Sequence, residues 1–133
     1  MAETAEKFIE ALGKLESERD SEAIVSMFAD NCKIGNVASP HEFNGADGAR
    51  EFWENYRKTF DEVRSEFHNK IISEKTSALE WTTEGTSGAG EPIKYDGVSI
   101  LETDGDKITR FFAYFDPHRL GNQIKKEAQS GGR

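Results

Sequence analysis

Two aspartates are the residues of this chain best suited to proton transfer. Asp96 lies within a run of alternating apolar and polar residues, and Asp116 ends another such run directly before Pro117. A carboxylate that faces an apolar pocket can act as a general base. Each aspartate also has a purely structural interpretation, because aspartate beside glycine or proline commonly faces solvent at a turn. The sequence therefore offers two candidate bases.

Other kinds of site find less support. His41, His68 and His118 lie far apart, without the short histidine spacings that are typical of a metal site. Cys32 is the only cysteine, and it is more typical of a small buried side chain than of a nucleophile. The glycines between residues 85 and 90 lack the spacing of a phosphate-binding loop and precede a predicted strand. We therefore expect neither a metal nor a cofactor.

The composition indicates one acidic domain. The chain has 133 residues, with 17 Lys and Arg against 25 Asp and Glu, which gives a formal net charge of −8. This charge argues against a nucleic-acid partner. The longest apolar run, residues 111–115, is far shorter than the roughly 20 residues that cross a bilayer, so we expect no membrane partner. The single cysteine and the lack of a signal-peptide pattern predict a cytoplasmic protein.

Periodicity predicts helices first and strands afterwards. Apolar residues recur at helical spacing over residues 5–15, 23–28 and 49–60. A short strand is predicted over residues 32–37, and residues 38–44, which contain Pro40, are predicted to be a loop. Beyond residue 61 the period becomes two. Predicted strands then cover residues 67–72, 78–86, 93–103 and 107–115, with Asp104-Gly105 as a hairpin turn. This order indicates an α+β fold.

Three stretches carry a more specific pattern. Residues 20–30 (DSEAIVSMFAD), residues 45–60 and residues 104–116 (DGDKITRFFAYFD) match a helix with its turn, a helix, and a final hairpin. Together they resemble the nuclear transport factor 2-like superfamily, which includes SnoaL-like polyketide cyclases and ketosteroid isomerases. The resemblance implies a cone-shaped curved antiparallel sheet wrapped around three N-terminal helices, with a pocket between them. We expect one domain over residues 1–123 and a flexible C-terminal tail over residues 124–133.

The resemblance also implies which residues face the pocket. On the convex side of the last strand it places Ile108, Arg110, Phe112 and Tyr114, and Tyr95 is expected to turn away from the pocket. The result is an aromatic wall that is typical of a site for a hydrophobic small molecule. The residues predicted to face the pocket are Trp53 and Tyr56 from the third helix, Leu79, Trp81 and Thr83, Asp96, Val98 and Ile100, and Phe111, Ala113 and Phe115.

The chemistry of ketosteroid isomerases is not carried over with the fold. Those enzymes use a carboxylate base and an oxyanion hole made of a tyrosine and a protonated acid. The resemblance places these roles on Asn36, Leu12 and Val98, and none of these side chains can perform them. Cyclase-like members use a pocket aspartate as base, so Asp96 and Asp116 remain the candidates here.

Two functions of different classes fit these features. The first is binding of a hydrophobic small molecule, with cofactor-independent isomerase, cyclase or hydratase chemistry in which Asp96 is the favoured base. The second is a non-catalytic binding or assembly module that forms a homodimer through the convex sheet face. The predicted ligand-binding residues are Asn36, Trp53, Tyr56, Trp81, Val98, Phe111 and Phe115.

Overall fold

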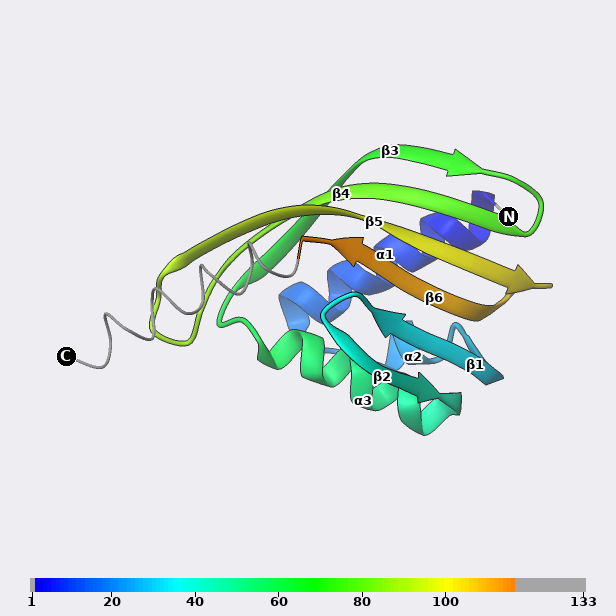
Figure 1. Ribbon diagram of the computed structural model, residues 1–133, viewed down its shortest axis with the longest axis horizontal. Coiled ribbons are helices and arrows are strands. Elements are labelled where there is room, and N and C mark those ends of the chain that lie inside the picture. The colour runs from blue at the N-terminus through cyan, green and yellow to red at the C-terminus, as the bar shows by residue number, and fades with distance from the viewer. Residues whose placement is uncertain (1, 117–133) are drawn as a thin grey trace.

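Three helices and six strands make up the described part of the chain (Figure 1). The structure, a computed structural model, describes residues 2–116. His118, the predicted end of the domain at residue 123 and the predicted tail over residues 124–133 lie outside this range. The elements are α1 (Ala2–Glu18), α2 (Glu22–Val25), β1 (Phe28–Asn36), β2 (Ser39–Asn44), α3 (Gly45–Lys58), β3 (Val63–Ile72), β4 (Thr76–Thr86), β5 (Pro92–Asp104) and β6 (Lys107–Phe115).

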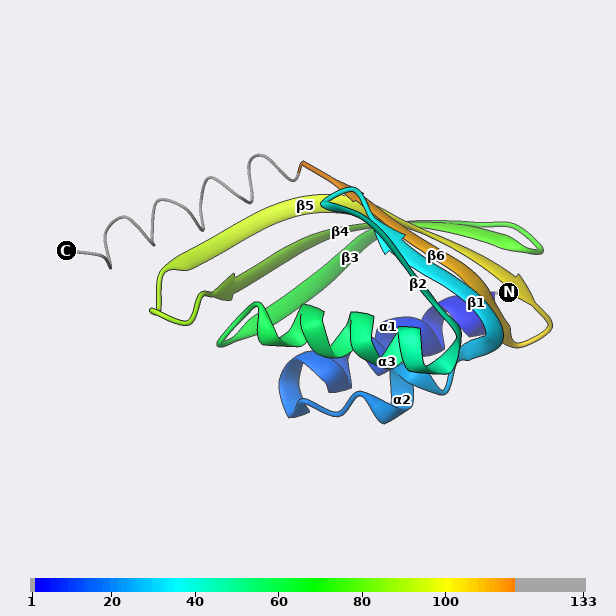
Figure 2. The same cartoon turned by 60° about the horizontal axis from the view of Figure 1, so that its bottom comes forward.

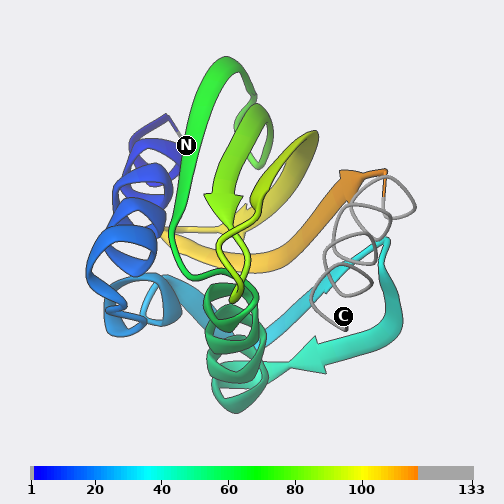
Figure 3. The ribbon, with the colours of Figure 1, turned by 90° about the vertical axis from the view of Figure 1, so that its left-hand side faces the viewer.

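The six strands form one curved sheet in the order β2-β1-β6-β5-β4-β3. The predicted antiparallel meander of β3 to β6 is confirmed, and β1 joins it through a parallel pairing with β6. All three helices lie on the concave side, as Figure 2 shows. Figure 3 shows that the sheet curls around them without closing, because β2 and β3 remain as separate edges. The expected α+β fold is confirmed.

Residues 38–44 were expected to be a loop, and that prediction is wrong for β2. Pro40 lies within this strand and provides no backbone N–H for a ladder. β2 is an edge strand that pairs with β1 alone, and an edge strand tolerates proline where its N–H would face solvent. The proline that suggested a loop therefore marks an edge.

The core lies between the helices and the concave sheet face. Apolar side chains from α1 and α2 meet those of the central strands there, as the helical and alternating periods predict. Within the described residues no helix is long and apolar enough to cross a membrane. The large apolar side chains with less than 2% exposure are Phe8, Leu15, Ile24, Ile34, Leu79, Leu101 and Ile108.

The sidedness of β5 is opposite to the prediction. Trp81 and Thr83 of β4 face inward as expected, and they pair with Gly97 and Tyr95 of β5. Directly paired residues share one face of a sheet, so Tyr95 turns inward. Asp96, like Val98 and Ile100, consequently turns outward. The alternation along β5 was predicted correctly. Which of its alternate residues face inward, however, is decided by the register with β4.

A bulge explains a second correction. Ile108 was predicted to face the convex side, yet it is fully buried in the core. Glu102 pairs with Arg110 and Thr103 pairs with Ile108, so β6 carries one extra residue at Thr109. Such an extra residue reverses the alternation on one side of it. Ile108 and Phe111 therefore both face inward.

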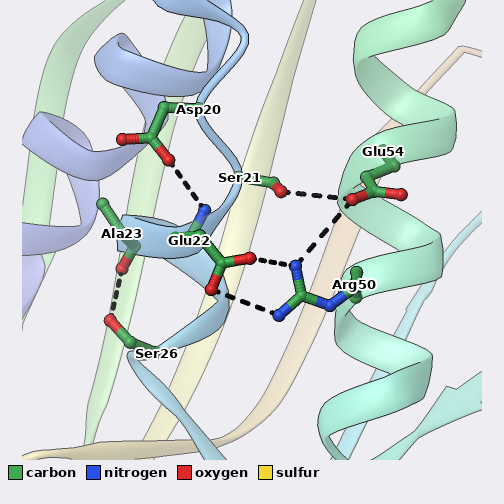
Figure 4. A network of polar contacts seen from close by, with 7 residues as sticks. All are labelled: Asp20, Ser21, Glu22, Ala23, Ser26, Arg50 and Glu54. Carbon is green, nitrogen blue, oxygen red and sulfur yellow. Dashed lines mark hydrogen bonds and ion pairs between the residues drawn. The ribbon is translucent and has the colours of Figure 1, made fainter.

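Polar contacts join the short helix α2 to α3 (Figure 4). Arg50 on α3 binds the Glu22 carboxylate with both terminal nitrogens, and Ser21 donates to Glu54 over 3.2 Å. Asp20 accepts the backbone N–H of Glu22 over 3.0 Å at the start of α2. Because the Glu22–Arg50 pair is exposed to solvent, it contributes little to stability.

Candidate functional site

A cavity of about 440 Å³ lies between the helices and the concave sheet face. Its size falls within the roughly 300–1,000 Å³ that is usual for small-molecule sites. Both tryptophans of the chain are among its lining residues. The aromatic part of the wall consists of Phe8, Phe43, Phe52, Trp53, Tyr56, Phe60, Phe67, Trp81, Tyr95, Phe111 and Phe115.

Helix α3 supplies one side of this wall. Trp53 and Tyr56 lie three positions apart, so they project from the same helix face, with ring centroids 5.9 Å apart. Trp53 also meets Phe111 of β6 edge to face, at a centroid distance of 5.0 Å. These ring contacts fix the position of α3 against the sheet.

Strands β4 and β5 supply the opposite side. Trp81 packs over Gly97, where an added Cβ would lie 2.5 Å from the indole ring and equally close to the Tyr114 carbonyl oxygen. The missing side chain at Gly97 thus makes room for the indole. The Trp81 Nε1–H donates to the Ser99 hydroxyl over 2.9 Å. Trp81 is therefore held as a rigid part of the cavity wall.

A buried carboxylate lies behind one end of the cavity. Glu16 of α1 is only 6% exposed. It accepts the Tyr56 hydroxyl over 2.7 Å, the Ser65 hydroxyl over 2.6 Å and the Ser65 backbone N–H over 3.0 Å. The Ser65 hydroxyl lies 2.7 Å from that of Thr83. Tyr56, Ser65 and Thr83 line the cavity, whereas Glu16 supports them from behind.

Two tyrosines at this end are held in the neutral form. Burial is the largest cause that raises the pKa of Tyr56 well above its usual range, and the negative charge of Glu16 adds to it. Burial, followed by the charge of Glu16, likewise raises the pKa of Tyr95. Tyr56 therefore keeps its hydroxyl proton and donates a hydrogen bond through it to Glu16.

This arrangement can move a proton. The Tyr56 oxygen can accept a proton from a bound molecule while the proton of Tyr56 passes to Glu16. The charge then resides on the deprotonated ligand, and Glu16 becomes neutral. A tyrosine in contact with a carboxylate thus provides base chemistry without a carboxylate in the cavity itself.

The structure brings most of the predicted ligand-binding residues together. Trp53, Tyr56, Trp81, Phe111 and Phe115 all line the cavity, as predicted. Their common location follows from the helical spacing on α3 and from the alternation on β4 and β6.

Asn36 and Leu12, on which the resemblance places two isomerase catalytic roles, also line the cavity. The Asn36 side-chain oxygen accepts the backbone N–H of Ala38 over 2.9 Å, so it shapes the turn that follows β1. The Asn36 amide nitrogen retains its two protons as donors.

The predicted orientations of Asp96 and Val98 are wrong. Asp96 is exposed on the outer face of the sheet, where it accepts the Thr82 hydroxyl over 2.6 Å. Val98 is half-buried on the same outer face, and neither residue lines the cavity. The reversed phase of β5 is the reason for both errors. The inward-facing residues of β5 at the cavity are Tyr95 and Ser99.

Asp116 is also outside the cavity lining. It follows the end of β6 and is exposed. Neither predicted aspartate is thus among the residues that line this cavity.

Sequence reasoning missed Glu16, Ser65 and Tyr95. Glu16 comes four residues after Leu12 and eight after Phe8, so it continues the apolar stripe of α1. A carboxylate on such a stripe signals a buried partnered acid, because glutamate is almost never fully buried without partners.

Among residues 2–116, no group of His, Cys, Asp and Glu is arranged to hold a metal ion.

Comparison with known families agrees with this architecture. The family model described as SnoaL-like domain matches residues 5–111, which is most of the chain. The chain belongs to the SnoaL-like domain family. No curated protein sequence matches this SnoaL-like domain.

Solved structures share the fold of this SnoaL-like domain at low sequence identity. An NTF2-like protein from Anabaena variabilis has a TM-score of 0.76 at 19% identity, covering 86% of this chain and 87% of that one. TerC, co-crystallised with polyporic acid, has a TM-score of 0.79 at 20% identity, covering 92% and 98%. An LEH-like epoxide hydrolase from M. tuberculosis has a TM-score of 0.73 at 15% identity, covering 93% and 91%. The nuclear transport factor 2-like fold is confirmed.

The raised tyrosine pKa values predict a loss of stability at high pH. Above about pH 10 the unfolded chain releases tyrosine protons that the folded SnoaL-like domain retains at Tyr56 and Tyr95. The free energy of unfolding therefore falls as the pH rises, by about 1.4 kcal/mol per pH unit for each such tyrosine. Tyr56→Phe removes one contribution, so its slope should be shallower by about that amount. Urea unfolding between about pH 10.5 and 12, where the unfolded tyrosines are mostly ionised, measures both slopes.

The control for this experiment is Thr82→Leu, a substitution on the outer face of β4 that leaves every tyrosine in place. The control should keep the slope of the parent protein. Equal slopes for the parent and Tyr56→Phe would show that Tyr56 is not protonated preferentially in the folded state.

Proposed function

We propose that this SnoaL-like domain binds a hydrophobic small molecule in its cavity and catalyses cofactor-independent proton transfer on it, of the isomerase, cyclase or hydratase type. One observation carries the proposal. An apolar cavity of about 440 Å³ ends at three hydroxyl-bearing side chains that are backed by the buried carboxylate of Glu16. Apolar walls with a few convergent polar groups are typical of a small-molecule site.

In this proposal the aromatic side chains hold the molecule and the Glu16–Tyr56 pair exchanges the proton. The ligand lies against Trp53, Trp81 and Phe111. The role that the sequence suggested for Asp96 passes to Tyr56 backed by Glu16, because their contact lies at the cavity. Co-crystallisation of TerC with polyporic acid and the epoxide hydrolase assignment of another neighbour support a small-molecule function for this fold.

The alternative of a purely structural assembly module is less well supported. Such a module needs only a filled core, and an open cavity lowers stability without a ligand to occupy it. The structure instead keeps a large space beside a well-packed core. The cavity therefore favours ligand binding over assembly alone.

Quenching of tryptophan fluorescence by bromobenzene tests ligand binding directly. Both tryptophans line the cavity, so a bound neutral bromoarene should quench them in a saturable manner. Ala113→Leu places a larger side chain in the cavity wall and should weaken binding by about tenfold or more through the lost volume.

Thr82→Leu is the control for added bulk, because Thr82 is on the outer face of β4. This variant should bind bromobenzene like the parent protein. Quenching that does not saturate in the parent, or binding that is unaffected by Ala113→Leu, would contradict a ligand site in this cavity.

We also propose that a second copy of the chain covers the outer sheet face. The outer sides of β5 and β6 carry the apolar residues Val98, Ile100, Phe112 and Tyr114, and the last is 44% exposed. The Phe112 and Tyr114 rings lie 4.7 Å apart, and Arg110 lies over the Phe112 ring. An apolar patch in the centre of a sheet face can pair with its own copy about a two-fold axis.

Tyr114→Glu should convert such a dimer into a monomer, because it would place a charge at the centre of the apolar patch. Light scattering after size-exclusion chromatography measures the change in mass. Ile71→Glu is the matched control, because Ile71 is 62% exposed but lies on the edge strand β3. A monomeric parent protein would overturn the dimer proposal without affecting the cavity.

A further inference from the structure

The hydrogen bonds around Glu16 all run in one direction. A carboxylate only accepts, so the hydroxyls of Tyr56 and Ser65 both donate to it, over 2.7 and 2.6 Å. Ser65 has a single hydroxyl proton, and Glu16 takes it. In the 2.7 Å contact between Ser65 and Thr83, the Thr83 hydroxyl must therefore be the donor. The protons of all three hydroxyls thus point along the network towards Glu16.

The direction of these hydrogen bonds determines which donors and acceptors a ligand would meet at the polar end of the cavity. Tyr56, Ser65 and Thr83 line the cavity, whereas Glu16 does not. With their protons committed to the network, the hydroxyl oxygens of Tyr56 and Thr83 keep the capacity to accept a hydrogen bond. The Tyr56 and Thr83 hydroxyls therefore present acceptors to the cavity, although both groups can also donate. The Tyr95 hydroxyl, which also lines the cavity, keeps its own proton.

The charge at this end acts in the same sense. Among residues 2–116, no lysine or arginine forms an ion pair with Glu16. The buried Arg57 is electrostatically coupled to Glu16, but its guanidinium donates to the backbone carbonyls of Phe60 and Asp61, over 2.9 and 3.0 Å. A carbonyl oxygen or an anionic group of a ligand would face oxygen lone pairs and the negative charge behind them. A hydroxyl group would instead find an acceptor that is polarised by a carboxylate, which strengthens its hydrogen bond.

We propose that the cavity selects hydrophobic alcohols and phenols, whose hydroxyl group donates to the Tyr56 and Thr83 oxygens, over ketones, ethers and carboxylates of similar shape. This inference rests on the proposed function, because it assumes that the cavity binds a small molecule. It adds the class of ligand and the group by which the ligand is oriented. Its physical basis is the direction of three hydrogen bonds.

The test compares 4-bromophenol with 4-bromoanisole, in which a methyl group replaces the donated proton. Isothermal titration calorimetry at about pH 7 should show that the phenol binds about tenfold more tightly, as one hydrogen bond to a charge-supported acceptor predicts. Bromobenzene, which lacks the oxygen, serves as the reference for binding by the aromatic wall alone.

Two variants assign this preference to the network. Tyr56→Phe removes one acceptor oxygen, so the preference for 4-bromophenol over 4-bromoanisole should fall to about twofold or less. Glu16→Gln introduces a carboxamide that donates as well as accepts, which frees a hydroxyl proton to point into the cavity. This variant should reduce the preference in the same way. Tyr114→Phe on the outer face is the matched control and should keep the parent preference.

The outcomes separate this inference from the proposed function. If all three probes bind the parent protein with equal affinity, the cavity is a ligand site but the selection of hydroxyl groups is wrong. If the phenol preference survives in Tyr56→Phe and in Glu16→Gln, the network is not its source and the inference is again overturned. If no probe binds the parent protein, the proposed function itself fails.

Discussion

The burial of the Glu16 carboxylate is the constraint on which the rest of the structure depends. An isolated charge below the concave face of a sheet costs several kcal/mol unless polar groups compensate it. Here the compensation consists of hydrogen bonds that Tyr56 and Ser65 donate, and Thr83 extends the network. These residues come from α3, β3 and β4, while Glu16 comes from α1. One carboxylate thus fixes four elements relative to one another at the polar end of the cavity.

The same constraint separates the apolar and polar parts of the site. The rings contributed by α3, β4 and β6 pack edge to face or at a tilt, and they line a largely apolar space. The hydroxyl network occupies one end of that space, and the Asn36 amide lies elsewhere on its wall. A ligand that fits the apolar part can therefore align its polar group with either of these two chemically different partners. Orientation in such a site follows from hydrogen-bond direction as much as from shape.

Local patterns in the sequence predicted the fold and about half of the site. Helical spacing on α3 correctly placed Trp53 and Tyr56, and the alternation on β4 correctly placed Trp81 and Thr83. The phase of β5 could not be obtained in this way, because Gly97 has no side chain to reveal its side. The register with β4 decides that phase, and it turns Asp96 outward. Hydrogen bonds between strands that are distant in sequence carry this information, and no local period contains it.

Glu16 shows a different limit of reasoning from residue types. Asp96 and Asp116 were predicted as bases because they are acids near strands. A glutamate on a helix with many charged residues, in contrast, indicates a side chain that is exposed to solvent. Its position on the stripe of Phe8 and Leu12 was the available signal, but its partners come from residues 40 and 49 positions away in the chain. Only the folded arrangement brings these donors together.

A crystal structure of the protein with 4-bromophenol bound would test the central claim most directly, because the bromine atom marks the orientation of the ring. The account predicts that the ring lies between Trp53 and Trp81 and that its hydroxyl oxygen is within hydrogen-bond distance of the Tyr56 or Thr83 oxygen. A ring bound the other way round, with its hydroxyl against Asn36 and its bromine at the Glu16 end, would contradict the claim.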